Sequence, residues 1–155
     1  MLEILKIEPY QWQVIGKLFL AFVLGFLIGL EREYRQRSAG VKTFTLVCLA
    51  STLFTILSRE AFQAYWIRTS YDPSRIISSI LIGIGFIGAG VIFKKPDRIE
   101  GVTTAAGLWI ATAVGISVGC GWYIISVVST LLVIALLFIL RKVDLWFDKF
   151  GRKRG

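Results

Sequence analysis

Residues 101–140 read GVTTAAGLWIATAVGISVGCGWYIISVVSTLLVIALLFIL, forty consecutive positions without a charged side chain. A helix needs about 20 mostly apolar residues to cross the ~30 Å hydrocarbon core of a bilayer. Forty residues therefore suit two crossings, and Gly119-Cys120-Gly121 in the middle predicts the turn between them. The stretch predicts a pair of antiparallel transmembrane helices over 102–118 and 123–140.

Three further apolar segments precede this pair, at residues 14–30, 43–57 and 76–93. Residues 43–57 would give a helix only ~22 Å long, which is short for a crossing, so we expect that helix to continue to residue 67. The pattern predicts an all-α polytopic membrane protein in which one membrane domain occupies residues 1–140. Its five transmembrane helices are expected at approximately 14–30, 43–67, 76–93, 102–118 and 123–140.

The distribution of positive charge predicts the orientation of these helices. The chain carries 18 Lys and Arg residues, and thirteen of them fall on one side of five crossings, in 32–42, 94–98 and 141–154. Because cytoplasmic loops carry the excess of Lys and Arg, we expect the N-terminus outside and the C-terminus in the cytoplasm. Residues 141–155 are expected to form a basic amphipathic helix on the inner leaflet. Topology and anionic headgroups account for the charge without nucleic acid.

Composition argues against a soluble enzyme. Hydrophobic residues make up 55% of the 155 positions, above the usual ~45–50% of soluble domains. The chain has no histidine, which removes the commonest general base and transition-metal ligand together. Its two cysteines, Cys48 and Cys120, make no disulfide framework. The membrane segments offer no nucleophile–base pair, so we expect a protein that is not an enzyme and has no resident cofactor.

Glycines recur at helical spacing in three of the apolar segments. The segment Gly83–Gly90 matches the dinucleotide fingerprint G-x-G-x-x-G, but it lies inside an uncharged crossing and no acidic residue follows at the required distance. Small residues in a membrane helix instead allow neighbouring backbones to approach closely. We therefore expect helix packing at Gly25, Gly29, Gly83, Gly85, Gly88, Gly90, Gly115 and Gly119. The small, mildly polar helix over 102–118 is expected to be the central one.

A charged cluster, Glu31-Arg32-Glu33-Tyr34-Arg35-Gln36-Arg37, follows the first apolar segment. Its spacing predicts Glu31–Arg35 and Glu33–Arg37 ion pairs on a helix that continues past the membrane. Glu31 lies closest to the apolar stretch, and an ionisable group at membrane depth is a candidate functional residue. Carboxylate oxygens suit Mg²⁺, so Glu31, Asp97 and Glu100 are weak metal candidates. Thr103 or Thr104 is expected to cap the helix that follows.

Several motifs resemble the MgtC/SapB family of bacterial inner-membrane proteins. The resemblance spans roughly residues 18–140 and keeps the order and spacing of the family motifs. The matching residues are Gly29-Leu30-Glu31-Arg32-Glu33, Ala39-Gly40-Val41-Lys42-Thr43 with Leu46-Val47, Gly83–Gly90, Gly101-Val102-Thr103-Thr104-Ala105-Ala106, and then Trp109, Ala113, Gly115, Gly119 and Gly121.

The resemblance implies a five-helix protein with an external N-terminus, in the bacterial inner membrane. Many family members continue into a soluble cytoplasmic domain after the fifth helix, whereas this sequence stops at Gly155 and looks like a short form. The implied role is growth under magnesium limitation and, in pathogens, survival inside host phagocytes. Polar positions of the matching motifs are candidate functional residues: Glu31, Arg32, Glu33, Lys42, Thr43, Thr103 and Thr104.

Two functions are compatible with these observations. The first is a non-enzymatic regulator that acts through helix contacts with itself, as a dimer, or with another membrane complex such as the F-type ATP synthase. The second is a small transporter or channel subunit for Mg²⁺ or another ion, which would use Glu31 and the Thr103-Thr104 region. Glycine-rich faces and the absence of a charged path through the bilayer favour the first.

The predicted orientation can be tested by thiol labelling. A Lys153→Cys variant should resist a membrane-impermeant thiol reagent in intact cells, because the C-terminal tail is expected in the cytoplasm. Disrupted cells provide the positive control for labelling. Ready modification in intact cells would contradict the five-crossing topology.

Overall fold

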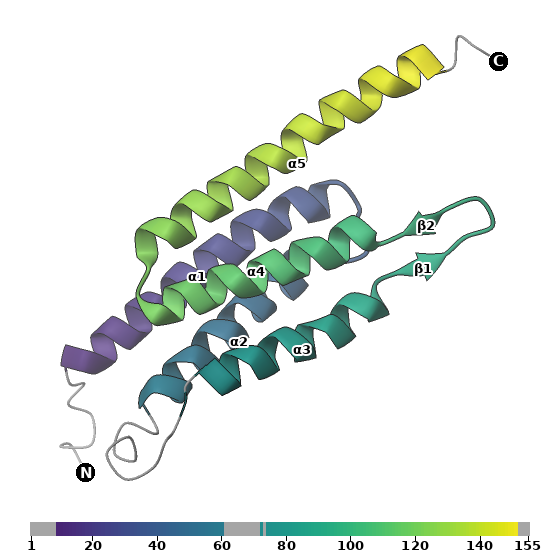
Figure 1. The fold of residues 1–155 in the computed structure, drawn as a ribbon. Helices are drawn as coiled ribbons and strands as arrows, with labels where there is room; N and C mark the ends of the chain where they lie inside the picture. Colours follow the sequence, from purple (N-terminus) through teal and green to yellow (C-terminus); the bar gives the residue numbers. More distant parts are fainter. Residues whose placement is uncertain (1–8, 61–71, 73, 152–155) are drawn as a thin grey trace.

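A computed structural model of the chain describes residues 9–60, 72 and 74–151. These residues form five helices and a two-stranded hairpin (Figure 1). The helices are α1 (Pro9–Tyr34), α2 (Val41–Glu60), α3 (Ser74–Gly90), α4 (Val102–Cys120) and α5 (Tyr123–Gly151), and the strands are β1 (Phe93–Lys94) and β2 (Ile99–Glu100). The predicted extension of the second helix from residue 61 to residue 67 lies outside the described residues.

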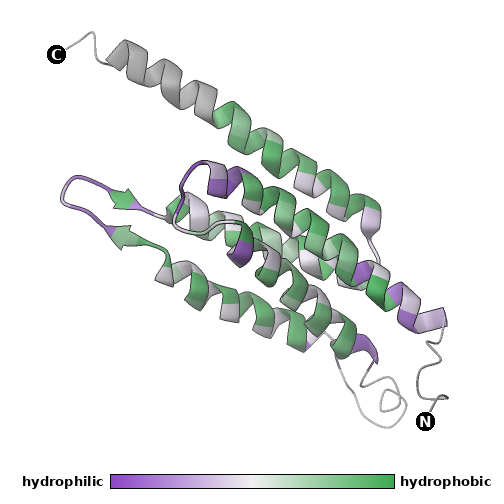
Figure 2. Ribbon diagram, turned by 180° about the vertical axis from the view of Figure 1, so that it is seen from behind, coloured by the Kyte–Doolittle hydropathy of each residue, from purple (hydrophilic) through white to green (hydrophobic). Residues whose placement is uncertain are grey.

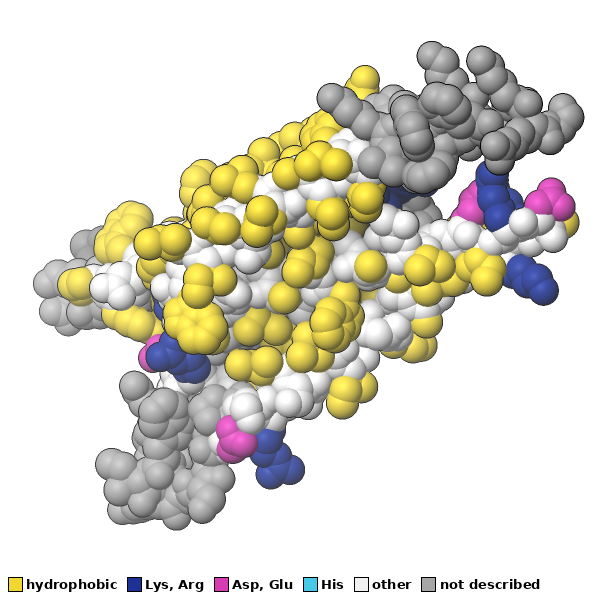
Figure 3. Space-filling model, turned by 45° about the horizontal axis from the view of Figure 1, so that its top comes forward, with side chains coloured by type: hydrophobic (Ala, Val, Ile, Leu, Met, Phe, Trp, Pro, Cys, Tyr) yellow, Lys and Arg dark blue, Asp and Glu magenta, His cyan; other side chains and the backbone are white. Residues whose placement is uncertain are grey.

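The five helices make an all-α, multi-pass membrane fold. Four of them, α1, α2, α4 and α5, are long and apolar enough to cross a bilayer, and α3 is a shorter apolar helix of 17 residues. Hydrophobic residues run along the helices, whereas hydrophilic residues gather towards the bundle ends and the hairpin (Figure 2). On the face drawn in Figure 3, hydrophobic side chains cover the middle of the bundle and charged ones lie towards its ends. The predicted fold class is confirmed.

Helix α4 is the centre of the bundle, as its composition predicts. It contacts each of the other four helices. Its buried face is built largely from small and apolar residues, among them Gly107, Leu108, Ala111, Gly115 and Gly119. The Leu108 side chain is fully buried in one hydrophobic cluster that also contains Ile28 and Phe44. Because its side chains are small, α4 can lie close to several neighbours at once.

Four glycines allow the tight contacts among α1, α2 and α4. A Cβ atom added at Gly25 would lie 2.8 Å from Cys48 Cβ, and one at Gly29 would lie 2.6 Å from Val41 Cα. The same addition at Gly119 would lie 2.7 Å from Thr55 Cβ, and at Gly115 it would overlap Ser51 Oγ and the Cys48 carbonyl. No side chain fits at these positions without movement of the neighbouring helix. The prediction of helix packing holds for Gly25, Gly29, Gly115 and Gly119.

The glycines of α3 behave differently. A Cβ atom at Gly83, Gly85 or Gly90 would meet nothing within 4 Å, and one at Gly88 would make an ordinary contact of 3.6 Å with Ala105 Cβ. Helix α3 lies at the edge of the bundle, and its buried residues are only Ile84 and Gly88. The expectation that Gly83, Gly85 and Gly90 pack closely against other helices of this chain is therefore wrong, because open space lies beside each of them and Gly83 and Gly85 line clefts next to α3.

The connection between α3 and α4 is a β-hairpin that the sequence did not predict. The third helix ends at Gly90 and not at residue 93, and Phe93 pairs with Glu100 while Lys94 pairs with Ile99. Gly101 then joins the hairpin to α4 with a φ of +91°, and a Cβ atom there would overlap the Val91 carbonyl oxygen. Glycine is required at this junction both by its left-handed backbone and by this close approach.

The C-terminal end of α4 matches the predicted turn and is bound by two cations. Gly121 ends the helix in a left-handed conformation with a φ of +86°. Lys17 Nζ donates a hydrogen bond to the Gly119 carbonyl at 3.2 Å, and Arg59 Nη1 donates one to the Cys120 carbonyl at 3.1 Å. Positive groups stabilise the negative end of a helix dipole, so both contacts favour this end of α4.

The final helix does not end at the predicted membrane boundary. Helix α5 runs unbroken from Tyr123 to Gly151, whereas the sequence suggested a separate amphipathic helix after residue 140. Residues 123–150 contain no Pro and no Gly. Because nothing in the covalent chain interrupts the helix, it continues in one direction (Figure 1).

Substitution of two glycines tests this division between packed and open positions. Gly25→Ala should lower the free energy of unfolding in detergent by roughly 1–3 kcal/mol, because the added methyl group overpacks the α1–α2 contact. The matched control is Gly83→Ala, where the same methyl group enters open space and stability should be unchanged or slightly higher. Thermal unfolding followed by circular dichroism measures both. Equal stability of the two variants would contradict the packing described here.

Candidate functional site

A polar pocket of about 590 Å³ lies at one end of the bundle. It is formed where the C-terminal end of α1 and the loop after it meet the β-hairpin and the first turn of α4. Its lining residues are Arg32, Gln36, Arg37, Ser38, Phe93, Arg98, Ile99, Glu100, Gly101, Val102, Thr103 and Thr104. Two of the motifs singled out by the sequence therefore meet at one place, where Arg32 and Thr104, 72 positions apart, are hydrogen-bonded.

A buried charge cluster adjoins this site through Arg32. The side chains of Glu31 and Arg32 are both 3% exposed, and Glu31 forms ion pairs with Arg35 and, at 3.8 Å, with Arg32 Nη1. The predicted Glu31–Arg35 pair is confirmed. Arg32 Nη2 also donates a hydrogen bond to Thr104 Oγ1 at 2.9 Å, which links α1 to α4. Buried charges are tolerated when they are paired and hydrogen-bonded, and here two guanidinium groups face one carboxylate.

Helix α5 also contacts this cluster. The Arg35 guanidinium lies over the Phe138 ring at 5.3 Å from its centroid. An arginine over an aromatic ring is attracted by the negative face of the ring. The cluster therefore joins α1, α4 and α5.

Glu33 caps the second helix instead of pairing along the first. Its Oε2 accepts a hydrogen bond from the Val41 backbone N–H at 3.0 Å. Gly40, the residue before this helix, has no side chain to cap it, and Glu33 supplies the missing acceptor. The predicted Glu33–Arg37 pair is thus replaced by a contact across the loop. Lys42 is exposed and Thr43 partly exposed in the first turn of α2.

The two threonines at the start of α4 do not cap it. The N-cap residue is Gly101, and no side chain caps this helix end. Thr104 is 2% exposed and accepts the hydrogen bond from Arg32, whereas Thr103 is exposed and lines the pocket. The predicted capping role is wrong because the helix begins at Val102, directly after the left-handed Gly101, so that Thr103 and Thr104 already lie inside its first turn.

The three carboxylates proposed as weak metal candidates do not form one cluster. Glu100 is paired with Lys95 at 2.9 Å and with Arg98 at 2.6 Å. Hydrogen bonds from Lys95 and then Arg98 lower the pKa of the Glu100 carboxyl below its usual value, so it is held charged. Asp97 is exposed in the hairpin turn. Among the described residues, no group of three or more His, Cys, Asp or Glu side chains could hold a metal ion.

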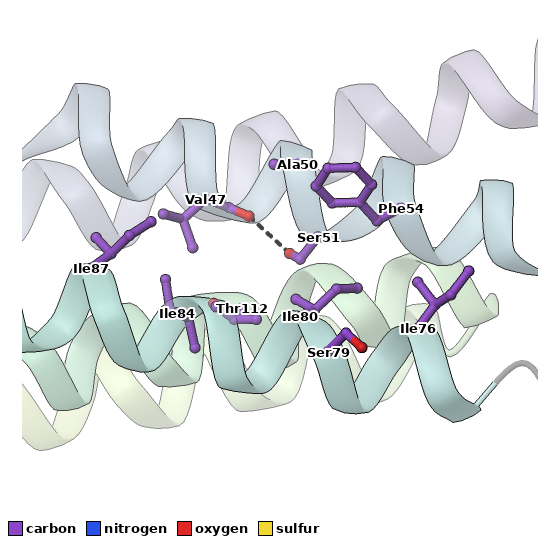
Figure 4. A pocket seen from close by; sticks show the side chains of 11 residues that line it. Val47, Ala50, Ser51, Phe54, Ile76, Ser79, Ile80, Ile84, Ile87 and Thr112 are labelled. Carbon is purple, nitrogen blue, oxygen red and sulfur yellow. Dashed lines mark hydrogen bonds between the residues drawn. The ribbon is translucent and has the colours of Figure 1, made fainter.

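Two shallow clefts flank α3, and neither was predicted. The cleft between α2 and α3 has a volume of about 410 Å³ (Figure 4). Its lining is mainly apolar, with hydroxyl groups from Ser51, Ser79 and Thr112, and Ser51 Oγ donates to the Val47 carbonyl at 2.9 Å. A second cleft of about 390 Å³ lies between α3 and α4, where Gly85, Gly88 and Trp109 line it. Helix α3 is thus attached along a narrow strip.

Buried hydroxyl groups on α2 are a further feature that sequence reasoning missed. Those of Ser51, Thr52, Thr55 and Ser58 are at most 2% exposed. Thr52 Oγ1 lies 2.9 Å from the Cys48 carbonyl of its own helix and 2.8 Å from the Gly115 carbonyl of α4, both of which accept from it. The three- and four-residue spacing of these Ser and Thr residues was the available signal, since it places them on one helix face.

The link between α1 and α4 can be tested at neighbouring threonines. Thr104→Val should destabilise the protein by roughly 1–3 kcal/mol, because the buried Arg32 guanidinium loses its acceptor. Thr103→Val is the matched control, since it makes the same change at an exposed position and should have little effect. Thermal unfolding in detergent reports both. A Thr104→Val protein as stable as wild type would show that this hydrogen bond is unimportant.

Comparison with known proteins finds several relatives of this chain. The chain is 40% identical over 135 residues to protein MgtC of Brucella abortus (strain 2308), which covers 87% of this chain and 54% of that protein. It is 41% identical over 114 residues to protein SapB of Bacillus subtilis (strain 168), covering 71% of this chain and 49% of the relative. It is 39% identical over 127 residues to YhiD of Escherichia coli (strain K12), which is named as a candidate magnesium transporter. That match covers 79% of this chain and 59% of the relative.

These relatives are longer proteins, and the chain spans 49–59% of their lengths. No solved structure matches the chain. The sequence profile of the MgtC family matches residues 18–146, which include the charge cluster, the glycine-rich α3 and the whole of α4. This multi-pass membrane protein therefore belongs to the MgtC family.

Proposed function

We propose that this chain is a non-enzymatic regulator in the bacterial cytoplasmic membrane that supports growth under magnesium limitation. In this proposal it acts by binding another membrane protein through its helices, with the N-terminus outside and the C-terminus inside. Family membership and a relative named for magnesium transport support the link to magnesium. The relatives are longer than this chain, and any activity of the parts of them that this chain does not match is outside the proposal.

The observation that carries the proposal is the open surface of α3. Ile82 is 78% and Phe86 85% exposed, and Gly83, Gly85 and Gly90 have open space where a side chain would lie. The clefts on both sides of α3 are mainly apolar. In a bilayer, glycines on a helix surface permit the close approach of another helix. Both sides of α3 thus offer an apolar surface on which the backbone of a transmembrane partner helix could approach closely.

Two partners fit this surface. One is a second copy of the chain, which would make a homodimer through α3. The other is a different membrane complex, for which the family resemblance suggests the F-type ATP synthase. In either case the partner would contact a helix that contributes few residues to the buried core of this chain.

A single copy offers little support for ion conduction. Among the described residues, the buried charged side chains are Glu31 and Arg32, and they pair at one end of the bundle. Between the ends, the core contains Leu24, Val114 and Val118, each no more than 4% exposed. The buried hydroxyl face of α2 is the observation that favours the alternative, a small transporter or channel subunit for Mg²⁺ or another ion. Hydroxyl and carbonyl oxygens are suitable ligands for such ions.

A growth assay with matched glycine variants tests the contact proposal. Gly83→Leu and Gly85→Leu should leave folded yield unchanged, because each side chain enters open space, but should abolish rescue of a deletion strain at low magnesium. Gly16→Leu is the control, since Gly16 on α1 also has nothing within 4 Å of an added Cβ atom. Rescue by all three variants at wild-type levels would refute the proposed role of α3.

A flux assay separates regulation from transport. Purified folded protein in liposomes with an internal Mg²⁺ indicator should give no entry above that of empty liposomes. Thr52→Val keeps the shape of the side chain but removes the hydroxyl that contacts α4. Mg²⁺ entry that requires wild-type Thr52 would replace the regulatory proposal with the transport one.

A further inference from the structure

The polar pocket beside α4 carries an excess of positive charge. Its lining includes three arginines, Arg32, Arg37 and Arg98, against one carboxylate, Glu100. That carboxylate is already paired with Arg98 and with Lys95. The other nearby carboxylate, Glu31, is paired with Arg35 and Arg32. The pocket therefore presents unbalanced guanidinium charge, which disfavours a cation such as Mg²⁺ and favours an anion.

The start of α4 adds backbone donors to the same pocket. Gly101 through Thr104 line it, and Ala105 N–H makes the first bond of the helix, to the Gly101 carbonyl at 2.8 Å. The backbone N–H groups before Ala105 have no acceptor within the helix, and no side chain caps them. The N-terminal end of a 19-residue helix also carries partial positive charge. Such helix starts bind phosphate and other anions.

Arg32 supplies an independent indication of a ligand. The residue is 2% exposed and lines the pocket, and its Nη2 is bound to Thr104. Among the residues that the structure describes, its Nε has no hydrogen-bond partner, although its Nη1 lies 3.8 Å from Glu31 Oε2. A buried donor without an acceptor is destabilising, and most such groups in proteins are satisfied. An anion in the pocket would give the Arg32 Nε an acceptor that the described residues do not provide.

We propose that this pocket binds a phosphate group. Arg32, Arg37 and Arg98 would donate charge-assisted hydrogen bonds to its oxygens, and the first-turn amides of α4 would donate the rest. The phosphate can belong to an anionic lipid headgroup, because the pocket lies at the end of a membrane bundle, or it can be free in solution. The proposal is independent of the contact surface on α3, which lies on other residues.

Ligand-dependent thermal unfolding tests this site in an uncharged detergent and a phosphate-free buffer. Inorganic phosphate is titrated in one arm. Short-chain phosphatidylglycerol is titrated in the other, with short-chain phosphatidylcholine as its uncharged comparison. Wild-type protein should be stabilised in a saturable manner in at least one arm. Arg37→Gln and Arg98→Gln should raise the half-saturating concentration roughly tenfold or more, because each removes a charged donor.

The matched control is Arg75→Gln, which removes the same charge from an exposed residue in the first turn of α3. Arg37 and Arg98 are used in place of Arg32 because both are exposed and their replacement leaves the buried cluster intact. Stabilisation by inorganic phosphate that is lost in these two variants supports a free phosphate ligand. The same loss with phosphatidylglycerol alone supports a lipid headgroup. No stabilisation in either arm, or an equal loss in Arg75→Gln, would overturn the proposal.

Discussion

Close backbone contact among α1, α2 and α4 is the constraint on which the remaining structure depends. Lipid tails are as apolar as the helices, so burial of apolar surface gives little drive for helices to associate in a bilayer. The association depends instead on dense packing and on hydrogen bonds between helices. Gly25, Gly29, Gly115 and Gly119 allow the packing, and the Thr52 hydroxyl reaches the Gly115 carbonyl because α2 and α4 lie so close.

The same constraint positions the polar pocket. Because α1 and α4 are held in one register, the end of α1 brings Arg32 to Thr104. The tight turn through Gly40 then brings Val41 within hydrogen-bond distance of Glu33. On the other side, Gly101 joins the hairpin to α4 through a left-handed backbone conformation that lies close to the Val91 carbonyl. The residues that line the pocket are therefore held both by backbone geometry and by contacts among themselves, such as that of Arg98 with Glu100.

The sequence alone predicts the helices better than their surfaces. Hydrophobic length and the Gly119–Gly121 turn predict five helices, and the small residues of α4 predict its central position. The glycines of α3, like those of α1 and α4, recur at helical spacing, so spacing alone cannot show that Gly83, Gly85 and Gly90 have open space beside them. The β-hairpin is two residues long in each strand, too short to produce an alternating pattern. The meeting of Arg32 with Thr104 depends on tertiary packing, which local sequence does not encode.

The two ends of α4 are electrically unequal. At its C-terminal end, Lys17 and Arg59 bind the carbonyl groups and offset their negative partial charge. At its N-terminal end, the arginines of the pocket add to the positive partial charge of the amides. The protein's own cations thus bind the carbonyl end of the helix, whereas the amide end faces the polar pocket. Counter-ions will collect at the Gly101 end, and their local concentration there will fall as the ionic strength of the adjoining solution rises.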